Sequence, residues 1–372
     1  MKFLRISSLY PELINSYYNK YKFIRNESYE KQYNHVINQK FSISNFLTKE
    51  LEKKNIKTYE IISNLKYLQL AWLKKYEKKE NKSILAQQIL HYNPDVIFFG
   101  NLDLIDREIS EILNSANFKN IIKIGYHCAP INNKQLSVLK NLTFLVTCVE
   151  DYKKKFKNII DTILIPHAFD ISCIEKTTKK RDIDIAFIGS LFLKKELHYN
   201  RINILYQIIR SKYKSYIAIN FKNFFLNFLQ FFLKNILTNS VIVFKVFYIF
   251  LNSKKAIFGK EMYEILQRSK VMINLHINDT QYSGNMRLFE GTGCGCLVVT
   301  DKKKGIKKFF IDKKEIFTFN NKQVIFKLIT NCIDSYNFFK QVSLRAQKKT
   351  LSKYNYKKSA SILLNKIYSI YT

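Results

Sequence analysis

Short apolar runs alternate with helical patterns throughout the first half of the chain. The apolar runs predict strands at 2–9, 58–62, 95–99, 121–125 and 144–148. Helical periodicity occupies 42–53 and 66–92 between them, and Pro94 is expected to end the second helix. Because strands that alternate with helices pair in parallel, this half predicts an α/β domain built on a parallel sheet.

The same alternation restarts in the second half. A helix is predicted at 196–212, and strands are predicted at 184–188, 216–219, 271–274 and 296–300. From about 336 to 372, apolar residues recur near a 3.6-residue period, which predicts helices. A chain of 372 residues exceeds the usual size of one core, so two Rossmann-like domains are expected.

The apolar segment 160–170, which contains Pro166, marks the expected domain boundary. We predict an N-terminal domain at 1–165 and a C-terminal domain at 166–340. The helices at 341–372 either stay with the second domain or cross back to the first.

Residues 221–251 break this rhythm because they are dense in Phe, Leu, Ile and Val. We predict an apolar helical insert in the second domain. Its placement stays open between a buried or interdomain helix, a helix lying on a bilayer surface, and a membrane span. A span needs about 20 apolar residues with few charges, and Lys234 and Lys245 interrupt this run.

The formal net charge of +33 raises the question of a polyanionic partner. The cations are mostly lysines scattered among Asn, Ile, Tyr and Phe, which is the residue usage of an AT-rich genome. The charge therefore reflects either composition alone or attraction to acidic lipid. No nucleic-acid partner is predicted.

The six cysteines show neither paired disulfide spacing nor two CxxC pairs, which favours a reducing compartment. The first residues lack a signal-peptide core, because Arg5 breaks their short apolar run. We expect a cytoplasmic protein, either free or peripheral on the inner face of the membrane.

Glycines concentrate in one short stretch of the second half, where four of the nine fall within 284–295. The stretch predicts a polar loop, a helix of small residues and a buried strand. A helix N-terminus offers unpaired N–H groups, so a diphosphate is expected on the loop from Ser283 to Asn285. Arg287 would add a phosphate contact, and Glu290 would accept hydrogen bonds from a ribose. Alternatively, the glycines only permit close packing, and Arg287 and Glu290 form a surface pair.

The sequence Asn-Met-Arg-Leu-Phe-Glu at 285–290 resembles the donor-binding signature of the family-one and family-four type glycosyltransferases. Together with 259–266 and 269–276, it is more closely similar to the branch related to the spore maturation protein CgeB. The resemblance implies the GT-B type of fold, in which two Rossmann-like domains face each other across a cleft. It also implies a nucleoside diphosphate sugar as donor and no other cofactor.

In this family, the carboxylate that matches Glu290 binds the ribose, and an acidic residue eight positions earlier helps to hold the sugar. Tyr282 occupies that earlier position here, which makes Asn285 and Arg287 the stronger donor candidates. The predicted donor-binding residues are Gly189, Ser190, Arg201, Asn274, His276, Ser283, Asn285, Met286, Arg287, Leu288 and Glu290.

Several of these assignments have a structural alternative. Gly189 and Ser190 lie where a strand turns toward a helix, and their N–H groups could contact the diphosphate. The resemblance suggests that Arg201 supports the diphosphate, whereas its spacing from His198 also fits an exposed helix pair. His276 is either a site residue or a satisfied structural histidine.

In the first domain, His127 follows a predicted strand and is expected to point into the cleft. The resemblance suggests a polar or acid–base contact near the transferred sugar, and the alternative is a turn histidine without a chemical role. The acceptor is expected to enter near Ser8, Tyr10 and His127. No metal site is predicted, because Asp182 and Asp184 enter a strand instead of leaving one.

The predicted function is transfer of a hexose-type unit to an acceptor hydroxyl, without a metal and with retention of configuration. The acceptor would be a glycan, a lipid-linked molecule or a protein, and the expected process is the synthesis of a surface polysaccharide or another glycan. Two alternatives remain: a non-catalytic nucleotide or sugar binder of the same fold, and a basic peripheral membrane-binding protein.

Overall fold

The computed structural model describes residues 1–41, 44–79, 83–129, 131–175, 180–193, 199–221, 224–237, 239–277, 281–321 and 324–371. The chain divides into two compact units. Unit 1 comprises Met1–Pro166 and Tyr356–Thr372, and unit 2 comprises His167–Asn355.

Unit 1 contains a parallel six-stranded sheet with the order β2-β1-β3-β4-β5-β6. Its strands are β1 (Lys2–Ser7), β2 (Lys57–Ile62), β3 (Val96–Phe99), β4 (Ile122–Tyr126), β5 (Phe144–Thr147) and β6 (Thr162–Leu164). All four residues of β3 are buried, which fits a central strand covered on both faces.

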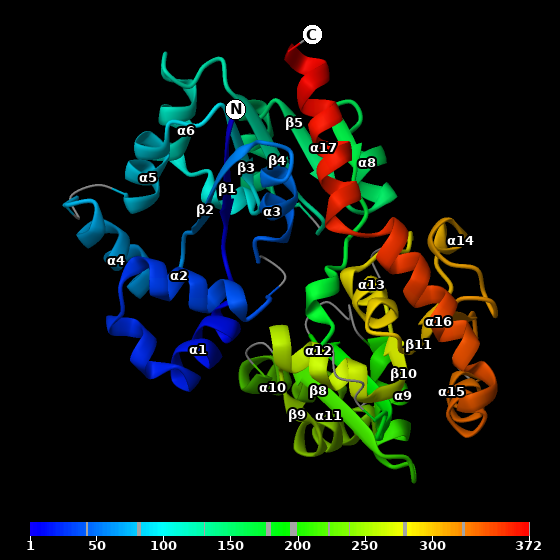
Figure 1. Cartoon of the computed structure of the whole chain (residues 1–372). Coiled ribbons are helices and arrows are strands. Elements are labelled where there is room, and N and C mark those ends of the chain that lie inside the picture. Colours follow the sequence, from blue (N-terminus) through cyan, green and yellow to red (C-terminus); the bar gives the residue numbers. More distant parts are fainter. Residues whose placement is uncertain are drawn as a thin grey trace. The chain divides into compact units, whose positions relative to one another are not determined.

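The helices of unit 1 connect these strands, and the last helix comes from the C-terminus. They are α1 (Pro11–Lys20), η1 (Lys22–Asn26), α2 (Tyr29–Asn38), α3 (Phe46–Glu52), α4 (Lys66–Lys75), α5 (Ile84–Tyr92), η2 (Leu102–Leu104), α6 (Arg107–Asn114), α7 (Asn133–Ser137), η3 (Val138–Asn141), α8 (Glu150–Phe156) and α17 (Tyr356–Tyr371). Helix α17, drawn in red in Figure 1, packs beside α3. Its stripe of Ala360, Leu363, Leu364 and Ile367 is buried in the core of this unit.

One prediction for this half was wrong in detail. The segment 66–92 forms two helices instead of one, since α4 ends at Lys75 and Glu77 adopts a left-handed conformation with φ of 51°. The segment 160–170 contains β6, which completes the sheet of unit 1 beside β5, and the division between the two units follows Pro166.

Unit 2 contains a second parallel six-stranded sheet, with the order β12-β11-β10-β7-β8-β9. Its strands are β7 (Ile183–Ser190), β8 (Ser215–Asn220), β9 (Lys254–Lys255), β10 (Ser269–Asn274), β11 (Leu297–Asp301) and β12 (Phe317–Phe319). The predicted strands of the second half correspond to β7, β8, β10 and β11, whereas the short outer strands β9 and β12 were missed.

Helices cover both faces of this second sheet. They are η4 (Ile171–Cys173), α9 (Tyr199–Ile209), α10 (Phe224–Asn235), α11 (Ser240–Asn252), α12 (Gly259–Arg268), α13 (Met286–Gly293), α14 (Ile306–Phe309), α15 (Ile325–Asp334) and α16 (Tyr336–Lys353). Helices α9, α11 and α15 share one apolar core with the sheet. Helices α12, α13 and α16 contact the strands as well, and α13 packs along α16.

The segment 221–251 is not an insert. Helices α10 and α11 form the connection from β8 to β9, so they continue the regular alternation of the sheet. Only one side of α11 is buried, through Val243, Val246 and Ile249. Within the described part of the chain, every helix is too short or too polar to cross a membrane.

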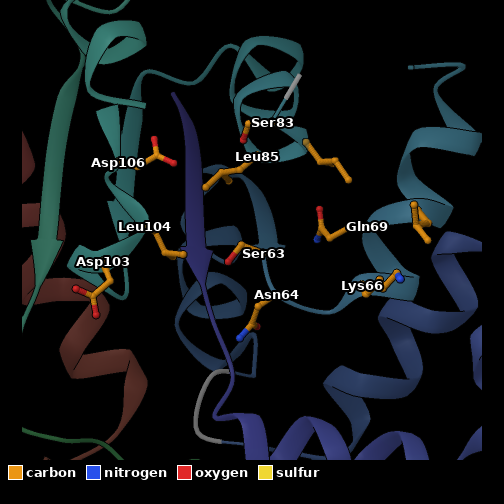
Figure 2. Close-up of a pocket in the computed structure, with 11 residues that line it drawn as sticks. Ser63, Asn64, Lys66, Gln69, Ser83, Leu85, Asp103, Leu104 and Asp106 are labelled. Atoms are coloured by element: carbon orange, nitrogen blue, oxygen red, sulfur yellow. The ribbon is translucent and has the colours of Figure 1, made fainter. Parts of the chain in front are cut away.

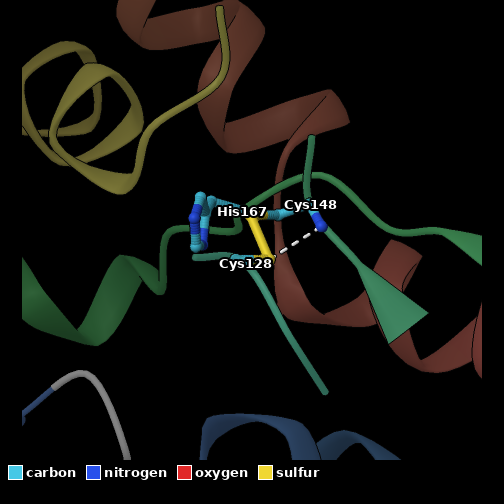
Figure 3. A group of neighbouring side chains, drawn as sticks. All are labelled: Cys128, Cys148 and His167. Atoms are coloured by element: carbon cyan, nitrogen blue, oxygen red, sulfur yellow. Dashed lines mark hydrogen bonds between the residues drawn. A yellow bond between two sulfur atoms is a disulfide. The ribbon is translucent and has the colours of Figure 1, made fainter. Parts of the chain in front are cut away.

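Cys128 and Cys148 form a disulfide in unit 1 (Figure 3). Cys128 directly follows the β4–His127 segment and Cys148 directly follows β5, so the adjacent parallel strands bring their ends together. The Cα atoms lie 5.8 Å apart, within the range of disulfides. The spacing of the cysteines did not indicate this pair, because spacing along the chain does not reveal a contact across strands.

Small residues let α13 approach its neighbours closely. A Cβ atom on Gly293 would lie 2.5 Å from two ring carbons of Phe169. That ring is itself only 2% exposed, so it has little room to move. The close packing that the glycine-rich stretch permits therefore exists, and it fixes where the helix lies.

We expect Gly293→Ala to lower the free energy of unfolding by about 1–3 kcal/mol, because the added methyl group overpacks against Phe169. Urea denaturation of purified protein measures this change. In a Phe169→Leu background the same substitution should cost less, since the ring is gone. Equal costs in both backgrounds would show that this contact does not limit the packing.

Candidate functional site

The second sheet reverses its strand order between β7 and β10. From β7 the chain adds β8 and β9 on one side, and it then returns to place β10 on the other side. Ligands of open parallel sheets bind beyond the carboxyl ends of the strands at such a reversal. The predicted residues Gly189 and Ser190 end β7, and Asn274 ends β10. The fold thus brings these three residues to the same edge of the sheet.

Arg201 of α9 connects these two strand ends. Its Nη1 donates to the carbonyl oxygen of Ser190, and its Nη2 donates to that of Leu275 at 2.7 Å. The guanidinium also lies over the ring of Phe187, 5.7 Å from its centroid. Arg201 is therefore a buried residue of the sheet edge, and the alternative of an exposed helix pair was wrong. His198, its suggested partner, lies outside the described residues.

The buried guanidinium of Arg201 has a lowered pKa and an unsatisfied hydrogen-bond donor. Burial lowers its pKa to about 10, Asp301 raises it and Arg287 lowers it further. Within the described parts of the chain, its Nε atom has no hydrogen-bond partner. Buried donors rarely lack an acceptor. An anion beside Arg201 and Arg287 would balance the buried positive charge and could accept a hydrogen bond from this Nε.

Asn274 and Asn285 bind each other through their side-chain amides. The Nδ2 of Asn274 lies 3.0 Å from Oδ1 of Asn285, and the reverse bond measures 2.8 Å. Asn274 also donates to Oγ1 of Thr300 on β11, at 3.1 Å. This pair fixes the start of α13 to the ends of β10 and β11.

His276 binds Asp301 and the glycine loop. Its backbone N–H and its Nδ1 lie 3.0 and 2.8 Å from Oδ1 of Asp301, and the N–H of Gly284 points at its Nε2 over 3.4 Å. Because Nε2 accepts there, the proton must sit on Nδ1 and be donated to Asp301. His276 thus holds the loop in place, which corresponds to the structural alternative for this residue.

Asp301 was missed as a site residue, although it ends a buried strand and strand ends carry ligand-binding groups. Burial raises the pKa of its carboxyl group, but the hydrogen bonds that His276 donates and the charge of Lys303 outweigh this effect and lower the pKa overall. The carboxylate therefore stays ionised beside His276. Nothing in its own sequence neighbourhood identifies His276 as its partner.

Hydrogen bonds join the loop before α13 to the segment after β11. Ser283 donates through its N–H and its hydroxyl to the carbonyl oxygen of Lys304, at 2.9 and 3.2 Å. Asn285 is the N-cap residue of α13, and its side chain makes no capping hydrogen bond. Since Asn285 binds Asn274 instead, the first turn of the helix keeps N–H groups available for an anion.

Two predicted donor residues of α13 differ in exposure. Met286 is partly exposed at the first turn. Leu288 is fully buried and its N–H binds the carbonyl oxygen of Asn285. The side chain of Leu288 therefore belongs to the core, and a donor contact by this side chain was wrongly predicted.

Arg287 and Glu290 form an ion pair one turn apart on α13, with Nη1 and Oε2 2.5 Å apart. Arg287 also contacts the sulfur of Met262, and Tyr263 donates to Glu290 over 3.4 Å. The side chain of Glu290 is only 5% exposed, whereas that of Arg287 is 25% exposed. Both residues lie at the same end of the sheet as Arg201, and the pair is not a solvated surface pair.

The carboxylates of Asp182 and Asp184 lie at the opposite, amino-terminal end of β7. Asp182 accepts from both Arg268 and Lys214, at 2.7 and 2.9 Å. Asp184 accepts from Lys270 at 2.7 Å. These cations hold the pKa of Asp182 well below its ordinary value, with Arg268 contributing most. The two carboxylates thus act as partners of basic side chains.

His127 lies in unit 1, directly after β4. Its ring centroid is 6.0 and 6.3 Å from those of Tyr152 and Phe156 on α8, and the residue is 6% exposed. Burial lowers the pKa of the imidazole, and a backbone hydrogen bond with Ala129 opposes this effect. The ring therefore packs against α8 instead of standing free at the strand end, contrary to our expectation. Its Nε2 is buried and has no partner among the described residues.

Ser8 and Tyr10 follow β1 in unit 1. Ser8 accepts a hydrogen bond from Nδ2 of Asn101 at 3.1 Å, and Tyr10 is 67% exposed. Beyond β2 and β3, a pocket of about 480 Å³ opens at the carboxyl end of the same sheet (Figure 2). Its polar lining includes Ser63, Asn64, Lys66, Gln69, Asp103 and Asp106.

Asn64, which lines this pocket, makes two hydrogen bonds with the backbone of Leu9. Its Oδ1 accepts from the N–H of Leu9 at 2.9 Å, and its Nδ2 donates to the carbonyl oxygen of Leu9 at 2.7 Å. The segment after β1 is thereby fixed to the segment after β2. Sequence reasoning missed the pocket, and strand ends are again the signal that could have found it.

A comparison with protein families matches the part of the chain that contains this candidate site. Residues 231–365 match a protein-family model described as glycosyl transferase-like. This region includes β10, α13 and β11, with Asn274, Arg287 and Glu290. A comparison with curated protein sequences gives no match.

Solved structures share the whole fold. A glycosyltransferase from Rickettsia africae is 15% identical, with 98% of this chain and 97% of that chain covered and a TM-score of 0.54. HepE from Anabaena, in complex with UDP and glucose, is 11% identical, with coverages of 99% and 100% and a TM-score of 0.60. Sucrose-phosphate synthase from Thermosynechococcus elongatus is 8% identical, with coverages of 84% and 80% and a TM-score of 0.51. The chain thus has the α/β fold of these glycosyltransferase structures, with a parallel six-stranded sheet in each unit and a glycosyl transferase-like region at 231–365.

We expect Asp301→Ala to lower the free energy of unfolding by about 1–3 kcal/mol, because both N–H groups of His276 would lose their acceptor. Asp301→Asn keeps an oxygen at this position and should cost less. Chemical denaturation of the three proteins measures the difference. Equal stability of the alanine variant and the unchanged protein would contradict a positioning role for this pair.

Proposed function

We propose that the protein is a glycosyltransferase that binds a nucleoside diphosphate sugar in unit 2. The observation that carries this proposal is the meeting of Arg201, Arg287 and the uncapped start of α13 at the strand-order reversal of a parallel sheet. Two cations and free backbone N–H groups suit a diphosphate. The glycosyl transferase-like match over 231–365 supports the same assignment.

In the proposed reaction, an acceptor hydroxyl oxygen forms a bond to the anomeric carbon of the sugar. The bond from that carbon to the diphosphate oxygen breaks, and the nucleoside diphosphate leaves with the electron pair. The proton of the acceptor hydroxyl passes to a base or to solvent. Arg287, Arg201 and the N–H groups of α13 would stabilise the charge that develops on the leaving group.

The nucleoside of the donor would be held by Glu290. Its carboxylate can accept hydrogen bonds from a ribose diol when Arg287 turns toward the phosphates. HepE from Anabaena, which shares the fold, was solved with UDP and with UDP-glucose. We therefore propose a uridine nucleotide as the first donor to examine.

We propose that the acceptor binds in unit 1, near Ser8, Tyr10 and the pocket beyond β2 and β3. For His127, a polar contact with the sugar is proposed on the family resemblance alone, since its Nε2 is buried and its ring packs against α8. A role in surface polysaccharide synthesis, with retention of configuration, remains part of the proposal. A cytoplasmic location, either free or peripheral on the inner face of the membrane, remains part of the proposal.

Donor binding is tested by thermal shift with a panel of nucleoside diphosphates and their sugars. A ligand at about 100 times its dissociation constant should stabilise the protein by about 2.7 kcal/mol. Arg287→Ala should weaken binding about tenfold or more, because a charge-assisted contact is lost. Glu290→Gln should also weaken nucleotide binding. Glutamine has nearly the same size as glutamate, so this substitution leaves no cavity beside Arg287.

Arg210→Ala is the matched control, since Arg210 is an exposed arginine of the same unit. It should leave the shift unchanged. If all three variants kept the full shift, the donor site would lie elsewhere. Binding without release of free nucleoside diphosphate, in the presence of acceptor sugars, would favour the non-catalytic alternative.

We expect transfer to proceed without a divalent cation, because arginines and helix N–H groups supply the positive charge. The transfer rate should stay the same after treatment with an excess of chelator. Asp182→Asn should retain the rate too, as this carboxylate pairs with Arg268 and Lys214 at the far end of the strand. A loss of activity that added Mg²⁺ or Mn²⁺ restores would contradict this prediction.

A further inference from the structure

An apolar surface lies across α10 and α11 of unit 2. On α11, Val241, Phe244, Phe247 and Leu251 are exposed and follow one another at three- or four-residue spacing, so they share one side of the helix. Val243, Val246 and Ile249 face the core on the other side. Helix α11 is therefore apolar on both sides, although only one side is needed for packing.

Helix α10 extends this surface. Leu229 and Leu233 are 56% and 68% exposed, and they lie four residues apart. Between the two helices runs a groove of about 350 Å³, lined by Phe228, Phe232, Ile236, Ser240, Val243, Phe244 and Phe247. The rings of Phe228 and Phe247 meet across it, with centroids 6.0 Å apart. We name the exposed residues Leu229, Leu233, Val241, Phe244, Phe247 and Leu251 the apolar face.

Basic residues border the apolar face, and acidic residues are missing from the whole surrounding sequence. No Asp or Glu occurs from position 197 to position 260. Lys254 and Lys255 form the exposed strand β9, one residue after the end of α11. Arg210 donates to the hydroxyl of Tyr206 at 3.0 Å, and the ring of Tyr206 contacts that of Phe244, with centroids 6.3 Å apart.

Each of the two helices also carries a lysine inside its apolar sequence. Lys234 is exposed next to Leu233 on α10. Lys245 of α11 extends over the ring of Tyr206 and donates to Oδ1 of Asn203 at 2.8 Å. Long basic side chains that run along apolar surface can keep their charges at a water boundary while the apolar atoms leave the water.

We propose that the apolar face docks on the surface of a lipid bilayer that carries anionic headgroups. The exposed leucine, valine and phenylalanine side chains would enter the boundary between headgroups and acyl chains, and the flanking cations would attract the headgroups. A second protein copy would bring the same positive charge to the interface, and the two cationic borders would repel. An anionic surface is therefore the complementary partner. This inference is independent of the donor site.

The test is co-sedimentation of the full chain with vesicles. One set contains phosphatidylcholine alone, and the other contains phosphatidylcholine mixed with phosphatidylglycerol. The unchanged protein should pellet with the anionic vesicles, and raised salt should reduce this binding because it screens the lysines. The variant L233Q/V241Q/L251Q should bind these vesicles at least about tenfold more weakly.

Phe338→Gln is the matched control, because Phe338 is an 80% exposed apolar residue of α16 outside the apolar face. It should bind vesicles like the unchanged protein. Thermal unfolding of each variant shows whether the fold is intact, and the nucleotide-induced shift reports on the donor site separately. Equal vesicle binding by the triple variant would overturn the proposal, as would no binding of the unchanged protein to anionic vesicles.

Sedimentation velocity without lipid tests the alternative that a second copy of the chain covers the apolar face. The proposal expects a monomer both for the unchanged protein and for the triple variant. A dimer that the three substitutions convert to a monomer would assign the apolar face to a second copy of the chain and overturn the membrane proposal.

Discussion

The guanidinium of Arg201 joins the ends of the two strands between which the second sheet reverses its order. Its partners are the carbonyl oxygens of Ser190 and Leu275, which are neutral. Removing a cation from water is costly, and burial accordingly lowers the pKa of Arg201. Because carbonyl groups hold the guanidinium without cancelling its charge, the same side chain that fixes the strand ends also makes the site attractive to an anion. The geometry of the site and part of its positive charge therefore depend on one residue.

Packing at the far end of α13 determines where its first turn lies. Gly291 and Gly293 let the helix approach Met272 of β10 and the ring of Phe169. At the near end, Asn285 consequently reaches Asn274, and the two amides bind each other. A larger residue in the last turn would push the helix outward and separate these amides. The glycines thus serve the site through packing, while the anion-binding N–H groups belong to the first turn.

The sequence allowed most of the α/β framework to be predicted, because buried parallel strands such as Val96–Phe99 are continuous apolar runs. Two-residue β9 carries lysines and no apolar signal, so it was missed. Glycine spacing and strand ends located the loop before α13. Contacts between distant segments, such as His276 with Asp301 or Cys128 with Cys148, could not be predicted, since they depend on strand register.

The distribution of charge in unit 2 is more informative than the net charge of the chain. Acidic residues at the sheet are engaged by cations: Asp182 by Arg268, and Glu290 by Arg287. From position 197 to position 260 there are no acidic residues to balance the basic ones. Ion pairs with well-matched geometry contribute locally and leave little field at a distance, whereas unbalanced lysines around α10 and α11 do create one. A compositional excess of lysine spreads charge along the whole chain, but it does not by itself remove Asp and Glu from one apolar stretch.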